Sequence, residues 1–443
     1  MTTLTGTTTE SSGLVSHYKI EVPDPWNGTL VLYSHGYSFS PSAAADVGDA
    51  ITGGWLLSHG YALAGSSYST SGWALQQAFQ DQIAVLDVFA SQVGTPTRTI
   101  AWGHSLGGMI TAGLVQLFPN RFTAALPMCG VVAGGPGVWN QGLDSEFALA
   151  TLQAPGAFKL VNFTGLADAN TNFVAASNAL AAAQGTPQGR ARIALSAALA
   201  DLPGWFDPTS PEPASTDFAT QELNQFNWDN NPDFLFSFFG RLELEVRAGG
   251  NYSWNTGVDY HVQLSHSSDM AEVAALYAAA GLDLNKDLDT LNAAPRIAAD
   301  PAAAAYVEKF ITYNGHLNMP VLAMHTTGDG LVEVTDENAY AGVVRSAGDN
   351  SMLRQVFVHR AGHCTFSPAE TITAFQTLIH RLDTGRWEDG TNPDAMNAQA
   401  VALGSGSNVI FVGSPPHPVP ADPSFIDFQP DKFLRPFDAR DAA

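Results

Sequence analysis

The chain has 443 residues, a hydrophobic content of 45% and a formal net charge of −23 at pH 7. This length and apolar content suit a globular enzyme with one enlarged domain, or with a core and a cap. The negative charge repels phosphate backbones and anionic membrane surfaces, which excludes nucleic acid and membranes as partners. A membrane span needs about 18 to 20 consecutive apolar residues, and the sequence has no such run.

The first third of the chain alternates strand and helix patterns. Residues 17–22 alternate like an edge strand, and residues 28–33 form an apolar run like a central strand. Further strands are expected at 61–66, 98–102 and 123–132, and helices at 47–58, 72–93 and 109–118. Strands separated by single helices predict right-handed crossovers and a mainly parallel sheet.

A long segment, residues 135–317, interrupts this alternation. It carries alanine-rich helical patterns at 175–183, 190–202, 270–280 and 300–313. A segment of this length is too long for a loop. We therefore expect a folded, mainly helical cap inserted into a core formed by residues 1–134 and 318–386.

The strand pattern resumes after this segment. Strands are expected at residues 319–325 and 352–358, followed by an amphipathic helix at 367–382. Residues 387–443 are rich in proline and also carry phenylalanines, which argues against a disordered tail. We expect this last segment to lie on the core as an extended belt.

Residues 102–108, Trp-Gly-His-Ser-Leu-Gly-Gly, are the most informative stretch of the sequence. They place Ser105 between glycines, directly after an expected strand and before an expected helix. A tight turn of this kind holds the serine Oγ clear of the backbone, and the glycines avoid clashes where strand and helix nearly touch. Ser105 is therefore our predicted nucleophile.

A nucleophilic serine needs a base and an acid that orients the base. Asp329 directly follows the expected strand at 319–325, although an Asp-Gly pair is also a common surface turn. Glu333 and Asp336 are alternatives further from the strand end. For the base, His363 lies in the loop after the next strand. His359 is the alternative there, but its place close to the strand favours local packing.

An oxyanion hole completes such a site. The backbone amide of Leu106 follows the nucleophile, and that of Tyr37 ends the Ser-His-Gly-Tyr run after the strand at 28–33. We predict that these two amides hold the oxyanion. The Tyr37 ring is either a wall of the acyl pocket or part of the packing.

Four motifs together resemble the α/β-hydrolase superfamily, in its bacterial serine esterase, lipase and prolyl-oligopeptidase-like branches. They are the runs at residues 34–37, 103–108, 328–332 and 361–364. The resemblance covers residues 15–134 and 318–385 and leaves the cap and the belt unexplained. It implies an α/β fold with a mostly parallel, eight-stranded sheet, helices on both faces, and a triad of Ser105, Asp329 and His363.

The sequence has two cysteines, Cys129 and Cys364. Two cysteines cannot make a disulfide framework or a four-ligand zinc site, so they form either one bridge or two free thiols. The tannase and feruloyl esterase family, where a cysteine beside the serine is bridged to one after the histidine, is a partial resemblance. Cys364 fits it, but the residue before Ser105 is His104.

The cap carries an aromatic-rich stretch between residues 226 and 260. These rings form either the cap's own core or an apolar roof above Ser105, which would favour a hydrophobic or aromatic substrate group. Arg241 and Arg247 could instead anchor a substrate carboxylate. Our candidates for substrate contact are Tyr37, His104, Trp228, Phe238 and Trp254.

No cofactor or metal is expected. The run beginning at Asp283 is similar to the start of a calcium loop but lacks its turn glycine and closing glutamate. His261 and His266 do not share a helical face, which argues against a metal pair. No glycine-rich phosphate or dinucleotide motif follows the first strand.

The sequence thus predicts a serine hydrolase that cleaves a carboxylic ester, in a small molecule or a polymer, through an acyl-enzyme on Ser105. A capped aminopeptidase and an acyltransferase with the same triad are the alternatives. The N-terminus lacks the basic and apolar regions of a signal peptide, while the acidic, lysine-poor composition favours a secreted enzyme over a cytoplasmic one. The oligomeric state is not predicted.

Overall fold

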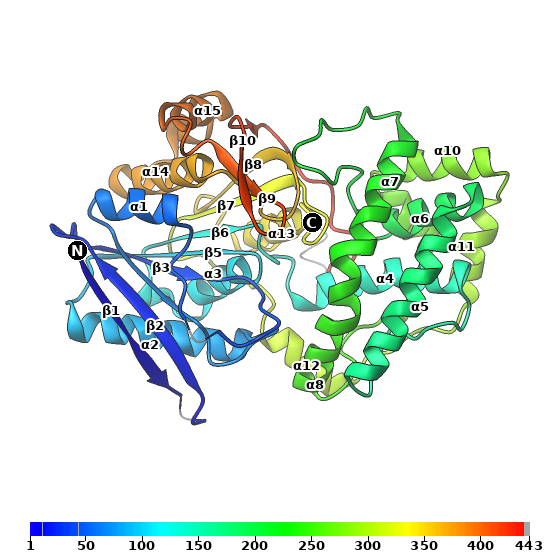
Figure 1. Cartoon of the computed structure of the whole chain (residues 1–443), viewed down its shortest axis with the longest axis horizontal. Coiled ribbons are helices and arrows are strands. Elements are labelled where there is room, and N and C mark those ends of the chain that lie inside the picture. The colour runs from blue at the N-terminus through cyan, green and yellow to red at the C-terminus, as the bar shows by residue number, and fades with distance from the viewer. Residues whose placement is uncertain (11, 43, 438–443) are drawn as a thin grey trace.

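The computed structural model describes residues 1–10, 12–42 and 44–437, with the backbone alone for residues 388 and 389. Within these residues the centre of the molecule is a sheet of nine strands in the order β1-β2-β4-β3-β5-β6-β7-β8-β11 (Figure 1). The strands are β1 (Thr2–Thr9), β2 (Val15–Val22), β3 (Thr29–Ser34), β4 (Ala62–Ser66), β5 (Arg98–His104), β6 (Ala124–Met128), β7 (Val321–Gly328), β8 (Leu353–Ala361) and β11 (Phe425–Ile426).

The sheet is mostly parallel, as predicted. The strands from β4 through β3 and β5 to β8 pair in parallel, and β1, β2 and β11 add antiparallel strands at the two edges. Two details of the prediction were wrong. β1 pairs with β2 along its whole length, so β2 is not an edge strand. The expected eight strands become nine because the C-terminal segment contributes β11.

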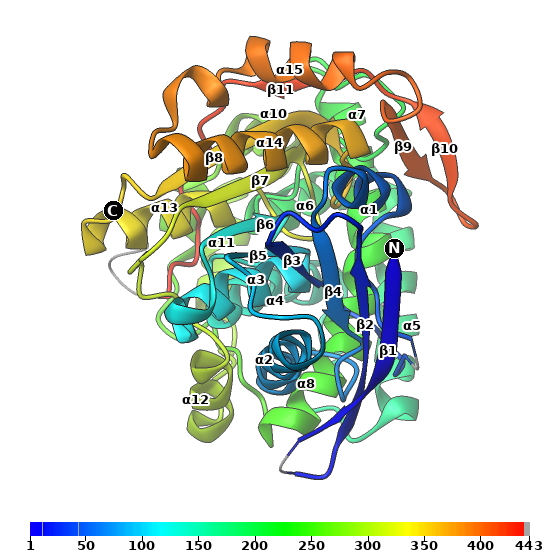
Figure 2. The ribbon, with the colours of Figure 1, turned by 90° about the vertical axis from the view of Figure 1, so that its left-hand side faces the viewer.

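Helices cover both faces of the sheet, so the central strands are apolar throughout. In β3, Leu30 and Leu32 pack with the core on one face, while Val31 and Tyr33 pack on the other. The first face is covered by α2 (Leu75–Gln92), α3 (Leu106–Leu117) and α13 (Asp336–Ala347), and the second by α1 (Ala50–Ser58) and α14 (Pro368–Thr384) (Figure 2). Ser367 and Glu370 cap the start of α14 reciprocally.

A helical segment lies between β6 and β7 and occupies the side of the molecule away from β1 (Figure 1). Its apolar side chains form two cores of their own, centred on residues such as Leu195 and Phe238. Its elements are α4 (Gly135–Gln153), α5 (Leu166–Gln184), α6 (Pro187–Ala198), α7 (Phe218–Trp228), η2 (Asp229–Asp233), η3 (Phe236–Gly240), α8 (Arg241–Ala248), α9 (Tyr260–His266), α10 (Met270–Ala280), α11 (Leu284–Ala293) and α12 (Pro301–Lys309).

The C-terminal segment is only partly extended, which corrects the prediction. It contains the helix α15 (Pro393–Ala402), capped by the Asn392 side chain, and a hairpin of β9 (Val409–Val412) and β10 (His417–Pro420). Proline at the first helical position does not disturb the helix, because that residue's N–H has no partner in a helix anyway. Met396 and Ala400 bury one face of α15.

The end of this segment contacts both the core and the helical segment. Phe433 packs beside Ala133 and Ala339. Arg435 forms an ion pair with the buried Asp144 of α4 and donates a hydrogen bond to the Trp254 carbonyl at 2.9 Å. Among the described residues, no helix has the length and apolar character needed to cross a membrane.

Candidate active site

Ser105 sits on a sharp turn between β5 and α3, with φ of 59° and ψ of −127°. A positive φ is uncommon for a residue with a side chain and marks a strained turn. The neighbouring glycines are required by space, because a Cβ on Gly103 would collide with the backbone of Gly107, and one on Gly107 with the Ser34 carbonyl. The serine Oγ is therefore presented at the carboxyl end of the sheet.

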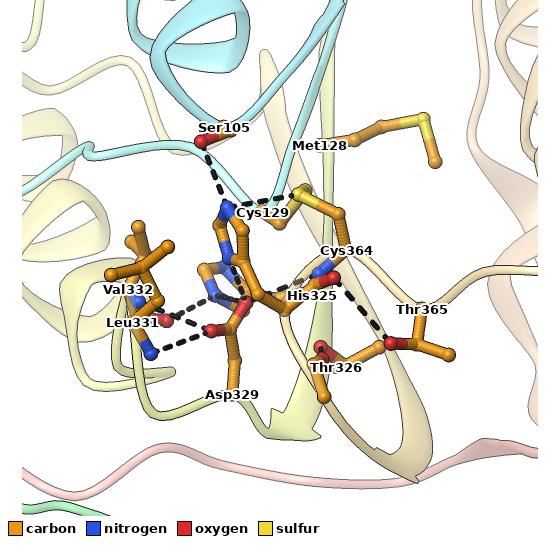
Figure 3. Close-up of a disulfide and its surroundings, with 12 residues drawn as sticks. Ser105, Met128, Cys129, His325, Thr326, Asp329, Leu331, Val332, Cys364 and Thr365 are labelled. Atoms are coloured by element: carbon orange, nitrogen blue, oxygen red, sulfur yellow. Dashed lines mark hydrogen bonds and ion pairs between the residues drawn. A yellow bond between two sulfur atoms is a disulfide. The ribbon is translucent and has the colours of Figure 1, made fainter. Parts of the chain in front are cut away.

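Three predicted side chains meet at this point (Figure 3). The Nε2 atom of His363 lies 2.8 Å from the Oγ of Ser105, and its Nδ1 atom lies 2.7 Å from Oδ2 of Asp329. Asp329 follows β7 and His363 follows β8, so adjacent parallel strands deliver both side chains. This geometry allows His363 to accept the serine proton.

The Asp329 carboxylate is held rigidly. Its Oδ1 atom accepts hydrogen bonds from the backbone amides of Leu331 and Val332, each at 3.1 Å (Figure 3). Its Oδ2 atom accepts the bond from His363 and a longer one from the Cys364 amide at 3.4 Å. With 1% of its surface exposed, Asp329 is a buried carboxylate whose oxygens are both used.

A second histidine, His325, lies behind Asp329 and was not singled out from the sequence. It is fully buried, 3.7 Å from Asp329 Oδ2 and 3.3 Å from Glu337 Oε1. Burial lowers the pKa of His325, but the hydrogen bond and charge of Glu337, with the charge of Asp329, outweigh it and raise that pKa to about 9. A buried imidazolium therefore faces the rear of the Asp329 carboxylate.

A disulfide joins Cys129, just after β6, to Cys364, next to His363 (Figure 3). The sequence left open whether the two cysteines form one bridge or remain free thiols, and the structure shows the bridge. The Sγ atom of Cys364 lies 3.4 Å from His363 Nε2. Gly362 turns the loop in the left-handed region, at a φ of 96°, and its amide bonds to the Gly328 carbonyl at 2.9 Å.

The predicted oxyanion donors lie beside Ser105. A Cβ built on Gly36 would stand 3.4 Å from the Ser105 Cβ, so the chain entering Tyr37 passes directly over the serine. The amide of Leu106 is at the first position of α3, where helix amides lack an internal partner. Among the described residues, neither the Tyr37 nor the Leu106 amide donates to another group.

A cavity of about 110 Å³ opens at Ser105 and Leu106. Its aromatic walls are Tyr37, Trp73, Trp139 and Phe236. The Nε1 atoms of Trp73 and Trp139 and the hydroxyl of Tyr37 are buried without a hydrogen-bond partner. The cavity thus combines apolar surface with unused hydrogen-bond donors.

Of the residues predicted to contact substrate, only Tyr37 lines this cavity. His104 instead packs against Tyr33, Trp102 and Phe366; burial, with a smaller contribution from the charge of His363, lowers its pKa to about 4. The other three belong to the framework of the helical segment. Trp228 packs against Phe206 and donates a hydrogen bond to the Trp205 carbonyl. Phe238 packs against Phe163 and Phe234. The backbone of Trp254 forms hydrogen bonds with the side chains of Asn140 and Arg435.

Three carboxylic acids also line the cavity: Asp229, Asp233 and Glu333. The sequence indicates Glu333 only as an alternative to Asp329, and no sequence motif singles out Asp229 or Asp233. Burial, together with the charges of Glu146 and Glu222, raises the pKa of Asp229 to about 8. Burial and neighbouring acids also raise the pKa values of Asp233 and Glu333 well above the usual range.

The remaining candidates have other surroundings. His359 packs on Trp205 and lies 3.3 Å from Glu212, in keeping with local packing. Asp336 is buried and accepts a hydrogen bond from the Ala133 amide at 3.0 Å. The two arginines considered for a substrate carboxylate do not line the cavity, since Arg241 stacks between Trp139 and Tyr252 and Arg247 pairs with Glu243.

One sequence pattern considered for metal binding has a structural role in this fold. Asp283, at the start of the calcium-like run, caps the helix α11 instead. In the part of the chain that the structure describes, no group of three histidine, cysteine, aspartate or glutamate side chains is arranged to hold a metal ion.

Comparison with known proteins places the chain in a family. Residues 59–134 match the profile of the prolyl oligopeptidase family. The o-phthalyl amidase of Xanthobacter agilis is 30% identical over 430 residues, covering 90% of this chain and 91% of the amidase. The solved structure of feruloyl esterase B from Aspergillus oryzae is similar with a TM-score of 0.43 and 13% identity, over 86% of this chain and 80% of that one. That of the acylaminoacyl peptidase from Pyrococcus horikoshii is similar with a TM-score of 0.40 and 10% identity, over 86% of this chain and 42% of that one. The chain belongs to the same family as the o-phthalyl amidase, among the serine hydrolases of the α/β-hydrolase superfamily.

Proposed function

We propose that this serine hydrolase cleaves a carboxylic ester or amide whose acyl group is apolar or aromatic, through an acyl-enzyme on Ser105. The observation that carries the proposal is the chain of contacts from Asp329 through His363 to Ser105, at 2.7 and 2.8 Å. A nucleophile, a base and a group that orients the base stand here at hydrogen-bond distance, which is what acyl transfer needs.

The first half of the reaction uses these groups in order. His363 takes the Ser105 proton at Nε2 as Oγ attacks the carbonyl carbon of the substrate. The amides of Tyr37 and Leu106 donate to the oxygen that becomes negative, and one such donor contributes roughly 3 to 4 kcal/mol to the stability of the transition state. Asp329 keeps the proton on Nδ1 and stabilises the imidazolium that forms.

The second half regenerates the enzyme. The protonated His363 gives its proton to the departing alkoxide or amine, and the carbonyl of the acyl-serine re-forms. Water, deprotonated by the same Nε2 atom, then attacks this ester and releases the free acid. An acyltransferase would use another acceptor in place of this water.

The cavity supports a compact acyl group. Its volume of about 110 Å³ compares with the roughly 150 Å³ of a cavity that holds benzene. Four aromatic residues line it, and aromatic surfaces pack well against a ring. The relative's name describes an amidase for o-phthalyl groups, which supports an aromatic acyl group and extends the expected bond from esters to amides.

We also propose a division of labour along the chain. Residues 1–134 and 318–386 form the catalytic core, residues 135–317 form a cap over Ser105, and residues 387–443 brace the two. The cavity supports this proposal because core residues such as Leu106 and segment residues such as Phe236 both line it. The contact of Arg435 with Asp144 supports the bracing role of the tail.

The test compares p-nitrophenyl butyrate, p-nitrophenyl benzoate and benzoyl p-nitroanilide as substrates. We expect release of free acid without an added acceptor, and a loss of about 10⁵-fold or more in kcat for Ser105→Ala. Ser91→Ala, at an exposed serine near the end of α2, is the matched control and should keep full activity. Full activity of Ser105→Ala would overturn the mechanism, and turnover only with an added acyl acceptor would favour an acyltransferase.

A further inference from the structure

We propose that Asp229, Asp233 and Glu333 form a subsite for an ammonium group on the acyl part of the substrate, next to Ser105. The inference rests on the proposed function, because it assigns a substrate class to the same cavity. All three residues line that cavity together with Ser105. A substrate that fits would carry a primary amine beside its apolar or aromatic acyl group, as aminoacyl esters and amides do.

The three acids come from two separate parts of the chain. Asp229 and Asp233 are the first and last residues of η2, a π-helical turn in the helical segment. Glu333 comes from the loop after β7, four residues beyond Asp329. Asn231 inside this turn has an extended backbone, with φ of −170° and ψ of 117°, so η2 is a kink between two helices. Here the turn brings two carboxyl groups to the wall of the cavity.

Asp229 and Glu333 are buried, and Asp233 is half-buried with both carboxylate oxygens covered. Asp229 is 4% exposed and its Oδ2 atom lacks a hydrogen-bond partner, as do both carboxylate oxygens of Asp233. Among the described residues, none of the three acids forms an ion pair. A buried carboxylate is normally hydrogen-bonded or paired, so the missing partner points to a ligand that supplies it.

Other acidic side chains surround these three acids. Asp233 lies within the electrostatic influence of Asp229, Glu333, Asp329 and Glu146. The buried Arg241 is a cation that acts on Glu146. Burial, and after it the charges of these neighbouring acids, raises the pKa values of Asp229 and Asp233 and favours their neutral forms while the cavity holds no cation. An ammonium group would favour their ionised forms.

The rest of the cavity suits an ammonium group as well. The aromatic residues Tyr37, Trp73 and Trp139 line the same cavity, and an aromatic ring attracts a cation that lies over its face. Their unpaired N–H and O–H groups can donate to a carbonyl of the same substrate. Among the described residues that line the cavity there is no lysine, arginine or histidine, so a bound carboxylate would have no ion-pair partner there.

The first experiment compares two substrates that differ only in the amine: phenylalanine p-nitroanilide and 3-phenylpropionyl p-nitroanilide. We expect kcat/KM to be at least tenfold higher for the amine. In Asp233→Asn and Asp229→Asn the preference for the amine should fall to within threefold. Glu272→Gln, at a buried acid outside the cavity, is the matched control and should keep the preference.

A second measurement does not depend on the choice of leaving group. Ligands that fill the cavity should slow labelling of Ser105 by a fluorophosphonate probe. We expect 2-phenylethylamine to protect at a concentration at least tenfold lower than 2-phenylethanol or phenylacetate. In Asp233→Asn this difference should disappear. The variant should also melt at the same or a higher temperature than the wild type, because it removes an unpaired buried acid.

The outcomes separate the two proposals. Equal protection by amine and alcohol in the wild type, or stronger protection by phenylacetate, would overturn the ammonium subsite while the labelling itself supports the proposed function. A preference for the amine that survives both aspartate substitutions would overturn the assignment to these residues. If the probe does not label Ser105 at all, the proposed function fails first.

Discussion

Two regions of this molecule hold carboxylic acids at or next to the cavity beside Ser105, and the hydrogen bonding of these acids differs. At the strand ends, Asp329 accepts hydrogen bonds from two backbone amides and from His363, with His325 behind it. In the helical segment, Asp229 and Asp233 reach the same cavity with unpaired oxygens. A carboxylate whose two oxygens both accept hydrogen bonds is fixed in place and can orient another side chain. A carboxylic acid whose oxygens have no hydrogen-bond partner can bind a ligand.

The largest effect should come from removing the base that Asp329 orients. His363→Ala should lower kcat by about 10⁴-fold to 10⁶-fold, because His363 is the base within hydrogen-bond distance of the Ser105 hydroxyl among the described residues. His359→Ala removes the other histidine of the same strand and loop, which packs on Trp205, and should change kcat less than threefold. Steady-state kinetics with p-nitrophenyl butyrate measure both. Equal losses in the two variants would remove the distinction between the histidines.

Neutralising Asp329 should nearly match this effect. Asp329→Asn should lower kcat by about 10⁴-fold at pH 7.5, because the amide stabilises the wrong tautomer of His363. Asp336→Asn is the control, since burial already raises the pKa of Asp336 to about 8 and an amide resembles its neutral form. We expect that variant to stay within threefold of the wild type. A comparable loss in Asp336→Asn would show that buried acids matter here for packing rather than for orientation.

Removing the disulfide should lower the stability of the fold and disturb the loop that carries His363. The bridge between Cys129 and Cys364 closes a loop of 235 residues, so replacing both cysteines with alanine should lower the free energy of unfolding by roughly 3 to 5 kcal/mol. Cys364 also adjoins His363, so we expect kcat to fall with stability. Denaturant unfolding and ester kinetics on the double variant measure the two effects. Unchanged stability and kcat would exclude a bracing role for the bridge.

Replacing His325 should remove a positive charge that lies next to the Asp329 carboxylate. The pKa of His325 is raised to about 9, so the imidazolium stabilises the fold fully below the unfolded value near 6.5 and loses this contribution as the pH rises through 9. The shift corresponds to about 3 kcal/mol. We expect His325→Gln to lower the free energy of unfolding by about this amount at pH 6 and by much less at pH 10. A difference that does not depend on pH would contradict a charged His325.

The meeting of Ser105, Asp329 and His363 at the carboxyl ends of the strands could be predicted from the sequence, because local residue patterns determine it. The resemblance to α/β-hydrolases is confirmed by the family, and the mostly parallel sheet by the structure. Each candidate of the triad follows a buried strand, and parallel strands end at a common edge, so the order of the chain alone predicts that Ser105, Asp329 and His363 meet. Their catalytic roles remain predictions that the variants above test.

The cavity walls could not be predicted in the same way. Aromatic residues of the helical segment look alike in sequence, yet Phe238 lies in a core of the segment while Phe236, two residues earlier, lines the cavity. That difference depends on how helices pack and on the π-helical turns around residues 229–240, which the 3.6-residue pattern does not reveal. Trp73 and Trp139 come from segments that carried no signal for the site.

The missed elements have similar causes. The prolines around α15 predict an extended chain, although Pro393 at its first position is compatible with a helix. β11 has two residues and exists only because it pairs with β8, which no local pattern encodes. Residues that acquire their role through tertiary contacts therefore need the structure.

Peptide mapping of a fluorophosphonate adduct tests the central claim most directly. The folded enzyme is treated with the probe and digested, and mass spectrometry identifies the labelled residue. We expect one adduct per chain, on Ser105, and at least a 100-fold slower labelling rate in His363→Ala, because the serine then lacks its base. A label on another residue, or an unchanged rate on Ser105 without His363, would contradict the proposed mechanism.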